Sequence, residues 1–495
     1  MKVWFDTNEK SIRSDDCDDD CDCAVRPSIS LTTLLDTSDL KQIWIYHLQQ
    51  ATPLFVQACG NEQWLICNPI GSGQLAVVDA QALHLLEEFR APTLLADVGR
   101  KVLLGLPESL EAIATLFYQL GFLVNPHQRF DNHQGGADTL SAWLHITNAC
   151  NLRCSYCYLQ KTNESMTDDI AQRSVDAVLR SARKHAFKQV RLKYAGGEAS
   201  LNLAGLLAIH DYATQQAQQN DISLRATILS NGVVLSQRVI DQLKSRQIGV
   251  TISLDGIGVY HDSQRPFLHG QGSFQYVDRT INRLLASDVV PYITVTVSRR
   301  NLTGLPELTQ YLLQHDLPFT FSYYRDNECS TNIRNLQFEE EEMIVAMRNA
   351  FSVIEQDLPK RCLLGSLVDK ANLQNMHDHT CGMGHNYLVI DQKGGIAKCQ
   401  ADIQHTVTTI DAEDPLYLIR NDASGIQSYS VNEKEGCRTC NWRYWCSGGC
   451  PLVTYRMTGR SDIKSPNCNI YKALFPEVLR LEALRLLKYA TPIIS

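Results

Sequence analysis

The amino-acid sequence predicts an α/β protein built around a mainly parallel sheet, with a smaller domain at each end. The 495-residue chain is long enough for about three domains, and six β-branched or aromatic runs alternate with helical stretches between residues 140 and 330. Strands that alternate with helices in this way form βα units with parallel strands. Six such units predict a partial (β/α)6 barrel, similar to part of a TIM barrel, with its functional residues on the loops after the strands.

The composition is that of an ordinary globular chain. It is 44% hydrophobic and 20% charged, which excludes collagen-like and largely disordered classes. The formal net charge of -8 lacks the basic excess of a general nucleic-acid or anionic-membrane binder, so neither partner is expected. The sequence contains no run of the roughly 18 apolar residues that a membrane span needs. Its first residues form no apolar signal-peptide core, so a cytoplasmic location is expected.

The region before the barrel divides into two parts. Residues 1–40 are polar, contain an acidic run and are predicted to be a disordered lead-in. Residues 41–125 combine strand-like segments with helical periodicities, which predicts a small α+β domain resembling a winged helix. The stretch 125–139 is rich in turn-forming residues and marks a domain boundary, so the barrel is expected over 140–330.

The candidate barrel strands are 143–147, 190–196, 225–231, 249–256, 292–298 and 319–324. The stretches between them carry apolar residues at helical spacing. Beyond the barrel we expect a linking acidic helix within 331–370, a loop-rich cysteine domain over 371–472, and a C-terminal helix over 473–495.

Three cysteines follow the first strand in the order Cys150-Asn-Leu-Arg-Cys154-Ser-Tyr-Cys157, on a loop at the carboxyl end of the sheet. In a reducing compartment, clustered cysteines are more often metal ligands or catalytic groups than disulfides. Three thiolates can hold three irons of a 4Fe–4S cluster and leave the fourth iron open to another ligand. A zinc site is the alternative, although structural zinc usually takes four ligands with paired C-x2-C spacings.

This cysteine loop, with Tyr156 before the third cysteine, resembles the signature of the radical SAM enzymes, and the resemblance extends over residues 140–470. It implies an enzyme that reductively cleaves S-adenosylmethionine (SAM) at the open iron. The resulting 5′-deoxyadenosyl radical would take a hydrogen atom from the substrate. The resemblance also implies an electron donor of the flavodoxin or ferredoxin type.

The same resemblance implies SAM contacts at the strand ends. Glu198 closes a Gly-Gly-Glu sequence after the second strand, where the GGE motif of the family contacts the amino group of SAM; alone, this sequence indicates only a strand-ending turn. Ser253 lies in an S-x-D-G sequence after the fourth strand, where relatives bind the SAM carboxylate or ribose. Arg265 is either a partner of that carboxylate or a solvated loop arginine. The candidate SAM-binding residues are Tyr156, Gly196, Gly197, Glu198, Ser230, Asn231, Ser253 and Arg265.

Seven cysteines beyond residue 371 have the spacings of the SPASM extension of radical SAM enzymes, which binds two auxiliary 4Fe–4S clusters. Matched position by position, one cluster would be held by Cys437, Cys440, Cys446 and Cys468, and the other by Cys381, Cys399 and Cys450. The motif gives no fourth ligand for the latter cluster, and Cys362, His385 or the substrate would fill that place. A zinc ribbon is the alternative, because C-x2-C pairs also bind zinc.

The remaining cysteines are Cys17, Cys21, Cys23, Cys59, Cys67, Cys329 and Cys362. The first three lie in the acidic segment. They either form a metal or redox site or belong to a disordered tail. Cys59 and Cys67 lie in apolar strands and are expected in the core. Cys329 follows the sixth strand and is either a candidate catalytic group or a plain loop thiol.

SPASM-bearing relatives mostly modify peptides or proteins, so the sequence predicts a maturase that installs a cross-link or another oxidative change in a ribosomal precursor peptide. Sulfatase maturases carry an Asp after the second SPASM cysteine as the proposed base. This sequence has Gln400 there and Asp402 two residues later as a candidate. Further alternatives are a small-molecule radical SAM enzyme and a non-catalytic, metal-stabilised peptide-binding protein. The 41–125 region resembles precursor-recognition domains, or is a cap that only packs on the barrel.

Overall fold

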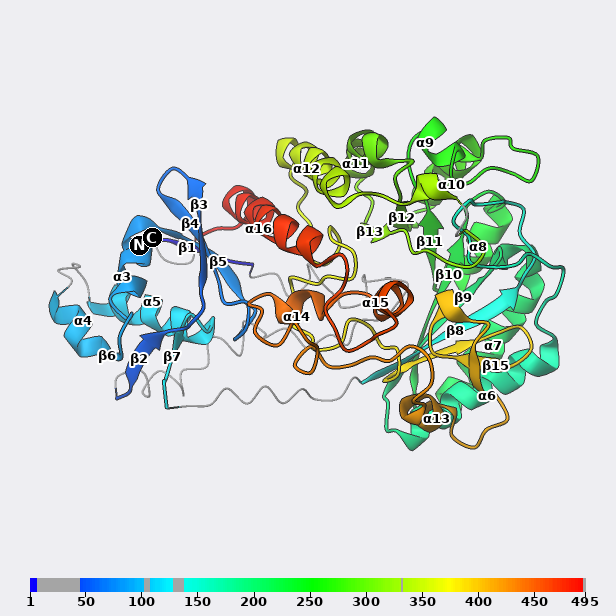
Figure 1. Ribbon diagram of the computed structural model, residues 1–495, viewed down its shortest axis with the longest axis horizontal. Helices are drawn as coiled ribbons and strands as arrows, with labels where there is room; N and C mark the ends of the chain where they lie inside the picture. The colour runs from blue at the N-terminus through cyan, green and yellow to red at the C-terminus, as the bar shows by residue number, and fades with distance from the viewer. Residues whose placement is uncertain (7–44, 102–106, 128–137, 331–332, 493–495) are drawn as a thin grey trace.

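The computed structural model describes residues 1–6, 45–101, 107–127, 138–330 and 333–492. A small N-terminal domain lies at one end of the long axis and the barrel at the other, with a C-terminal domain of short elements and loops between them (Figure 1). Cys17, Cys21 and Cys23 lie outside the described residues. No described helix has the length and apolar character to cross a membrane.

The N-terminal domain, as far as it is described, combines two antiparallel sheets with helices. One sheet has the order β1-β5-β4-β3, formed by β1 (Val3–Trp4), β3 (Phe55–Gly60), β4 (Gln63–Cys67) and β5 (Leu75–Asp79). The other has the order β6-β2-β7, formed by β2 (His47–Gln50), β6 (Thr93–Leu94) and β7 (Leu123–Val124). The helices are α3 (Ala80–Glu87), α4 (Leu95–Lys101) and α5 (Pro107–Gln119).

Two expectations for this region meet different outcomes. Cys67 is buried in β4 and Cys59 is half-buried in β3 against the core, so both pack as apolar residues. The expected disordered lead-in over 1–40 is wrong for its first residues, because β1 pairs with β5 and the segment Val3–Phe5 is buried. The prediction of disorder rested on the acidic composition of the whole segment and overlooked these few apolar residues. A peptide-recognition role for 41–125 stays a prediction.

The barrel confirms the six predicted strands. They are β8 (Thr139–Thr147), β9 (Gln189–Gly196), β10 (Ser223–Ser230), β11 (Ile248–Ser253), β12 (Tyr292–Val297) and β13 (Phe319–Tyr323). They pair in parallel in chain order, so their carboxyl ends lie at one edge of the sheet. Their β-branched and aromatic residues made these strands visible in the sequence, although β9 and β10 also carry Arg191, Lys193 and Arg225.

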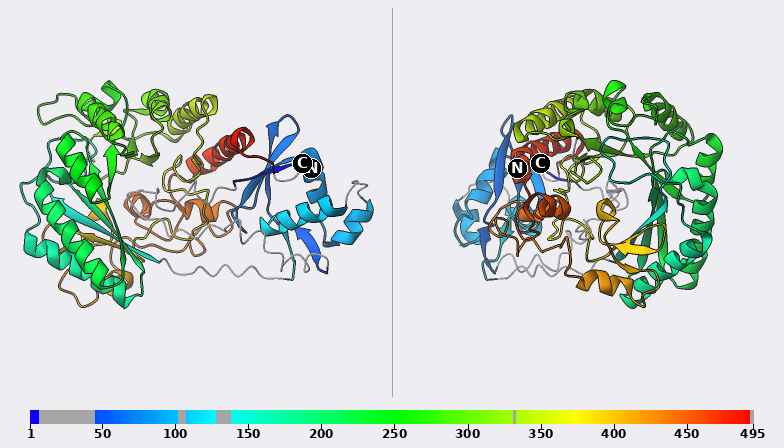
Figure 2. Two further views of the ribbon diagram at one scale, coloured as in Figure 1. Left: turned by 180° about the vertical axis from the view of Figure 1, so that it is seen from behind. Right: turned by 45° about the vertical axis from the view of Figure 1, so that its right-hand side comes forward.

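Helices cover the outer face of the curved sheet, as both views in Figure 2 show. They are α6 (Asp168–Lys184), α7 (Leu203–Gln219), α8 (Gln237–Ser245), α9 (Val259–Asp262), α10 (Phe274–Ala286) and α11 (Leu305–Gln314). Short 3-10 helices are η1 (Ala199–Asn202), η2 (Leu302–Gly304), η3 (Arg334–Leu336) and η4 (Gln400–Asp402). Because the helices lie outside, the loops at the strand ends are left to form the site.

Strands of the C-terminal domain continue the barrel sheet. β14 (Tyr387–Ile390) pairs in parallel with β8, and β15 (Gly395–Ala397) and β16 (Thr406–Thr409) follow as antiparallel neighbours. The full order is β13-β12-β11-β10-β9-β8-β14-β15-β16. The domain expected to begin at residue 371 therefore shares its sheet with the barrel, because the apolar run of β14 is buried against the first barrel strand.

Two longer helices connect the three parts of the molecule. α12 (Glu340–Gln356) begins at a capping box formed by Glu339 and Glu342, inside the predicted linking segment. α16 (Cys468–Tyr489) begins before the predicted start at 473 and packs against α12 and against β3, β4 and β5. Its Arg485 pairs with Asp6 at 2.6 Å, which ties the N-terminal segment to this helix. The shorter helices are α13 (Pro415–Asn421), α14 (Arg443–Cys446) and α15 (Pro451–Thr458).

Candidate active site

A cavity of about 230 Å³ lies where the carboxyl ends of the barrel strands face the C-terminal domain. Its wall contains loop residues after β8, β9 and β10, the ends of β11 to β13, and cysteine-bearing loops of the C-terminal domain. Cysteines from both parts line it: Cys150, Cys154 and Cys157 from the barrel, and Cys381, Cys399 and Cys450 from the C-terminal domain. The fold thus brings two of the three predicted cysteine sets to one cavity.

The three thiols after β8 are close enough to influence one another's ionisation. Burial raises the pKa of Cys154 to about 12, because the thiolate would lose its hydration. Lys161 donates a hydrogen bond from Nζ to the Sγ of Cys157 at 2.7 Å and supplies a positive charge at the site. Three thiols beside a cation and a cavity fit the donor set of a 4Fe–4S cluster with one open iron, since bound metal stabilises the thiolate form.

Glycines after β9 allow the cysteine loop to pass directly over the end of that strand. A Cβ on Gly197 would lie 2.3 Å from the carbonyl oxygen of Ala149, and one on Gly196 would lie 2.3 Å from that of Thr147. The backbone N–H of Gly197 donates to Thr147 O at 2.7 Å, and that of Glu198 donates to Ala149 O at 2.8 Å. The Gly-Gly-Glu sequence therefore fixes the start of the cysteine loop through its backbone.

The carboxylate of Glu198 joins the ends of two strands. It is buried and accepts hydrogen bonds from the backbone N–H of Asn231 at 2.7 Å, from Ser230 Oγ at 2.8 Å and from Ser200 Oγ at 2.5 Å. Gly196, Gly197, Ser230 and Asn231 line the cavity, whereas Glu198 lies behind them. A contact between Glu198 and SAM stays a prediction, and the structure assigns its carboxylate to positioning β10.

A buried ion pair lies beside Tyr156. The hydroxyl of Tyr156 donates to Asp255 Oδ2 at 2.6 Å and accepts from Arg265 Nη1, which lies 3.7 Å from the same carboxylate oxygen. Burial raises the pKa of Asp255, and the nearby Arg265 and Tyr156 oppose that rise. Arg265 is 7% exposed and lines the cavity together with Ser253, so it is not a solvated loop arginine.

The cysteines of the C-terminal domain lie in two places, and their assignment to two clusters stays a prediction. Cys381, Cys399 and Cys450 share a small apolar cluster that also contains Met383. The other group consists of Cys437, Cys440, Cys446 and Cys468, and the thiol of Cys446 interacts electrostatically with the other three. Burial raises the pKa of Cys437 to about 11 and that of Cys446 to about 12. Within the described residues, no three His, Cys, Asp or Glu side chains converge as they would around a single metal ion.

The two protein side chains considered as a fourth ligand lie behind the cavity wall. Cys362 is half-buried near Glu482 and Arg485 of α16, and burial raises the pKa of its thiol well above the usual value. His385 packs its ring against His379 with the centroids 3.9 Å apart, and burial lowers its pKa to about 4. Neither side chain is among the residues that line the cavity with Cys381, Cys399 and Cys450.

The two catalytic candidates also lie outside the cavity wall. Cys329 is an exposed loop thiol. Asp402 accepts from Arg456 at 3.2 Å, and the guanidinium of Arg456 lines the cavity in its place. Gln400 does line the cavity, and its Oε1 accepts a hydrogen bond from Tyr387 at 3.2 Å. Asp402 is therefore placed to position Arg456.

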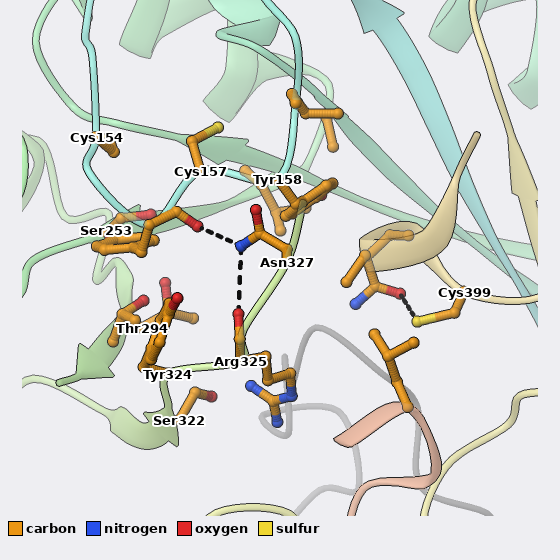
Figure 3. Close-up of a pocket in the computed structure, with 18 of the residues that line it drawn as sticks. Cys154, Cys157, Tyr158, Ser253, Thr294, Ser322, Tyr324, Arg325, Asn327 and Cys399 are labelled. Atoms are coloured by element: carbon orange, nitrogen blue, oxygen red, sulfur yellow. Dashed lines mark hydrogen bonds between the residues drawn. The ribbon is translucent and has the colours of Figure 1, made fainter. Parts of the chain in front are cut away.

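Sequence analysis missed Asn327 and Arg325, which stand between the two cysteine sets. Asn327 Nδ2 donates to the carbonyl oxygens of Tyr156 at 3.1 Å and of Arg325 at 3.2 Å (Figure 3). Arg325 Nε contacts Cys450 Sγ at 3.4 Å, and its Nη2 pairs with Asp369 at 2.8 Å. Both residues lie in the loop after β13. The expectation that functional residues lie on the loops after barrel strands, which pointed to Cys329, could therefore have found them as well.

Comparisons with known proteins extend the argument from geometry. Residues 144–310 match the family model of the radical SAM superfamily. An uncharacterized protein of Methanocaldococcus jannaschii is 29% identical over 171 residues, which cover 34% of this chain and 57% of that protein. A cysteine-type anaerobic sulfatase-maturating enzyme of Clostridium perfringens is 20% identical over 360 residues, which cover 66% of this chain and 93% of that enzyme.

A solved structure, native anSMEcpe with bound AdoMet and Cp18Cys peptide, has a TM-score of 0.58 and 18% identity to this chain. The match covers 70% of this chain and 99% of that one, which confirms the predicted fold class. The resemblance to SPASM-type maturases is thereby confirmed at the level of the fold. Together, the family model and the relatives named as maturating enzymes show that this chain is an enzyme with a radical SAM domain at residues 144–310.

Proposed function

We propose that this radical SAM enzyme is a SPASM-type peptide maturase that installs a cross-link or another oxidative change in a ribosomally made precursor peptide. The observation that carries the proposal is the shared cavity, which is lined by the first cysteine loop and by three cysteines of the C-terminal domain. Figure 3 shows Cys154 and Cys157 of the first set and Cys399 of the second. A substrate residue in this cavity would lie next to both sets. The bound peptide in the solved relative supports a peptide substrate.

When SAM and its cluster are bound, they supply the 5′-deoxyadenosyl radical that takes a hydrogen atom from the substrate. Cys150, Cys154 and Cys157 would hold this cluster. Ser253 and Arg265 would bind SAM, since both line the cavity and the guanidinium can form a charge-assisted hydrogen bond to a carboxylate. Apolar wall residues, including Leu159, Leu229 and Leu452, would keep water from the reacting C–H bond.

The C-terminal domain would hold two auxiliary clusters, one on Cys437, Cys440, Cys446 and Cys468 and the other on Cys381, Cys399 and Cys450. The latter three cysteines line the cavity that would receive the peptide. Because Cys362 and His385 lie behind the wall, this arrangement favours a substrate thiolate or amide as the fourth ligand. The auxiliary clusters would also offer a route for electrons to or from the substrate.

Sulfatase maturation is the second candidate, favoured by the similarity to the C. perfringens enzyme. Gln400 argues against it, because an amide lines the cavity where those maturases carry the proposed aspartate base. The nearby Asp402 is already paired with Arg456 and lies behind the wall. A non-catalytic binding protein is set aside by membership of an enzyme family.

Reconstituted enzyme tests the proposal in an oxygen-free reaction with SAM, dithionite and one of two peptides. One is a short peptide encoded beside this gene, and the other carries the active-site cysteine of a sulfatase. We expect the first peptide to stimulate 5′-deoxyadenosine formation and to lose a pair of hydrogens by mass spectrometry. Conversion of only the sulfatase peptide to an aldehyde would favour the second candidate, and modification of neither would contradict both.

A further inference from the structure

We propose that Lys434 is the positioning cation of both auxiliary cluster sites, a buried ammonium group that stabilises the reduced form of each cluster. The inference rests on the proposed function, because it requires that the two cysteine groups of the C-terminal domain hold clusters. It concerns a residue that belongs to neither cysteine motif.

The side chain of Lys434 occupies a space that the chain leaves open for it. The residue is 1% exposed, and its Nζ donates to the carbonyl oxygen of Ser447 at 3.0 Å. A Cβ on Gly448 would lie 2.6 Å from Lys434 Cδ and 2.9 Å from its Nζ, so only glycine fits at that position. Ser447, Gly448 and Gly449 have φ values of 45°, 79° and 70°, and this left-handed run forms the turn around the ammonium group.

This turn joins the two cysteine groups. It connects Cys446, from the group of four, directly to Cys450, from the group that lines the cavity. Thr380, next to Cys381, donates from Oγ1 to Ser447 O at 3.0 Å, the same carbonyl that accepts from Lys434. One carbonyl oxygen therefore ties together chain segments that carry cysteines of both groups.

Burial lowers the pKa of Lys434, and the thiols of Cys437, Cys446, Cys381 and Cys450, which belong to both groups, oppose that lowering. Arg325 contacts Cys450 of the cavity group. Lys464 and Lys472 act on members of the group of four. Lys434 is placed to act on thiols of both groups.

A buried ammonium group held by a single carbonyl is costly unless negative charge lies nearby. Clusters ligated by thiolates would supply that charge, so filled sites are expected to stabilise this position. Reduction adds a further negative charge to a cluster, and a fixed cation in a low-dielectric interior favours that change. Lys434 is therefore expected to raise the reduction potentials of both auxiliary clusters.

The test compares Lys434→Met with Lys398→Met. Lys398 is the control: it is also buried in the C-terminal domain, and its Nζ donates to the carbonyls of Asp422, Ser424 and Ile426, but its charge is paired with the Asp422 carboxylate at 2.7 Å. Both substitutions are made in protein in which Cys150, Cys154 and Cys157 are changed to Ala, so that only auxiliary clusters give signals. EPR-monitored redox titration should show both auxiliary potentials lowered in Lys434→Met and unchanged in Lys398→Met.

Iron and sulfide analysis separates failure of this inference from failure of the proposed function. If the background protein without further change binds no cluster iron, the proposed function fails. If Lys434→Met binds the full iron and keeps both potentials, or if Lys398→Met shows the same shift, the role of Lys434 is overturned.

A second variant is needed in case Lys434→Met fails to bind its clusters. Lys434→Gln keeps a donor for the Ser447 carbonyl but carries no charge, so it should load iron and lower both potentials. Loss of iron in both Lys434 variants, with Lys398→Met fully loaded, would assign Lys434 a role in folding only and overturn the electrostatic role.

Discussion

The barrel and the C-terminal domain hold their cysteines by different means. In the barrel, the cysteine loop begins where β8 ends, and backbone hydrogen bonds from Gly197 and Glu198 attach it to the neighbouring strand. In the C-terminal domain, the cysteines lie on loops and short helices, around a left-handed turn and the buried Lys434. The sheet can therefore position the three barrel cysteines without a bound metal. The cysteines of the C-terminal domain surround a buried positive charge, which bound clusters would neutralise.

The largest expected effect comes from removing one cysteine set at a time. Changing Cys150, Cys154 and Cys157 to Ala should abolish 5′-deoxyadenosine formation and leave about eight of about twelve irons, because the auxiliary sites are separate. Changing Cys437 and Cys440 to Ala should lower the iron content and also expose the C-terminal domain to limited proteolysis, because Lys434 loses its counter-charges. SAM cleavage that survives the first change would refute the assignment of the barrel site.

A smaller effect is expected from Gly197→Ala in the barrel. The new Cβ would meet the carbonyl oxygen of Ala149 and displace the start of the cysteine loop. A displacement of about 1 Å costs on the order of 100-fold in rate, measured here as 5′-deoxyadenosine formed per minute. Gly365→Ala is the control, because its Cβ would meet only Asn372 at 3.5 Å, an ordinary contact. Equal rates in the two variants would show that the close contact at the end of β9 does not determine the position of the cysteine loop.

The smallest expected effect is a dependence of barrel stability on pH. His261 is fully buried, its Nδ1 accepts from the backbone N–H of Asp255 at 3.3 Å, and its Nε2 bonds to Ser273 Oγ at 3.0 Å. Burial lowers its pKa well below the usual value, so the folded state holds the neutral ring. Its contribution to stability is therefore present above about pH 6.5 and is lost as the pH falls, by up to about 1.4 kcal/mol per pH unit.

Urea unfolding at two pH values, one above and one below the usual pKa of histidine, measures this loss. His261→Gln should show a flatter dependence of the midpoint on pH, because its amide does not titrate. A dependence as steep as that of the unchanged protein would place the acid sensitivity outside the barrel.

Sequence alone could predict the barrel because its parallel strands are β-branched or aromatic runs that alternate with helical stretches, and the cysteine sets because their spacings are specific. Sequence alone could not predict how the barrel and the C-terminal domain are joined. Only the fold shows that Tyr387–Ile390 pairs with β8, since a short apolar run does not name its partner. Likewise, the contact of Arg325 with Cys450 depends on loops that the chain brings together from distant positions, and the pairing of Arg265 with Asp255 depends on how the segment after β11 folds back.

The pairing of β14 with β8 has a consequence for biosynthesis. During translation, all six barrel strands through β13 are synthesised before β14, the segment that covers the edge of β8. Until then the first strand presents unpaired N–H and C=O groups, which other chains can bind. A chain cut after β13 should therefore aggregate, and the enzyme is expected to reach a soluble folded form only when its C-terminal third has been synthesised.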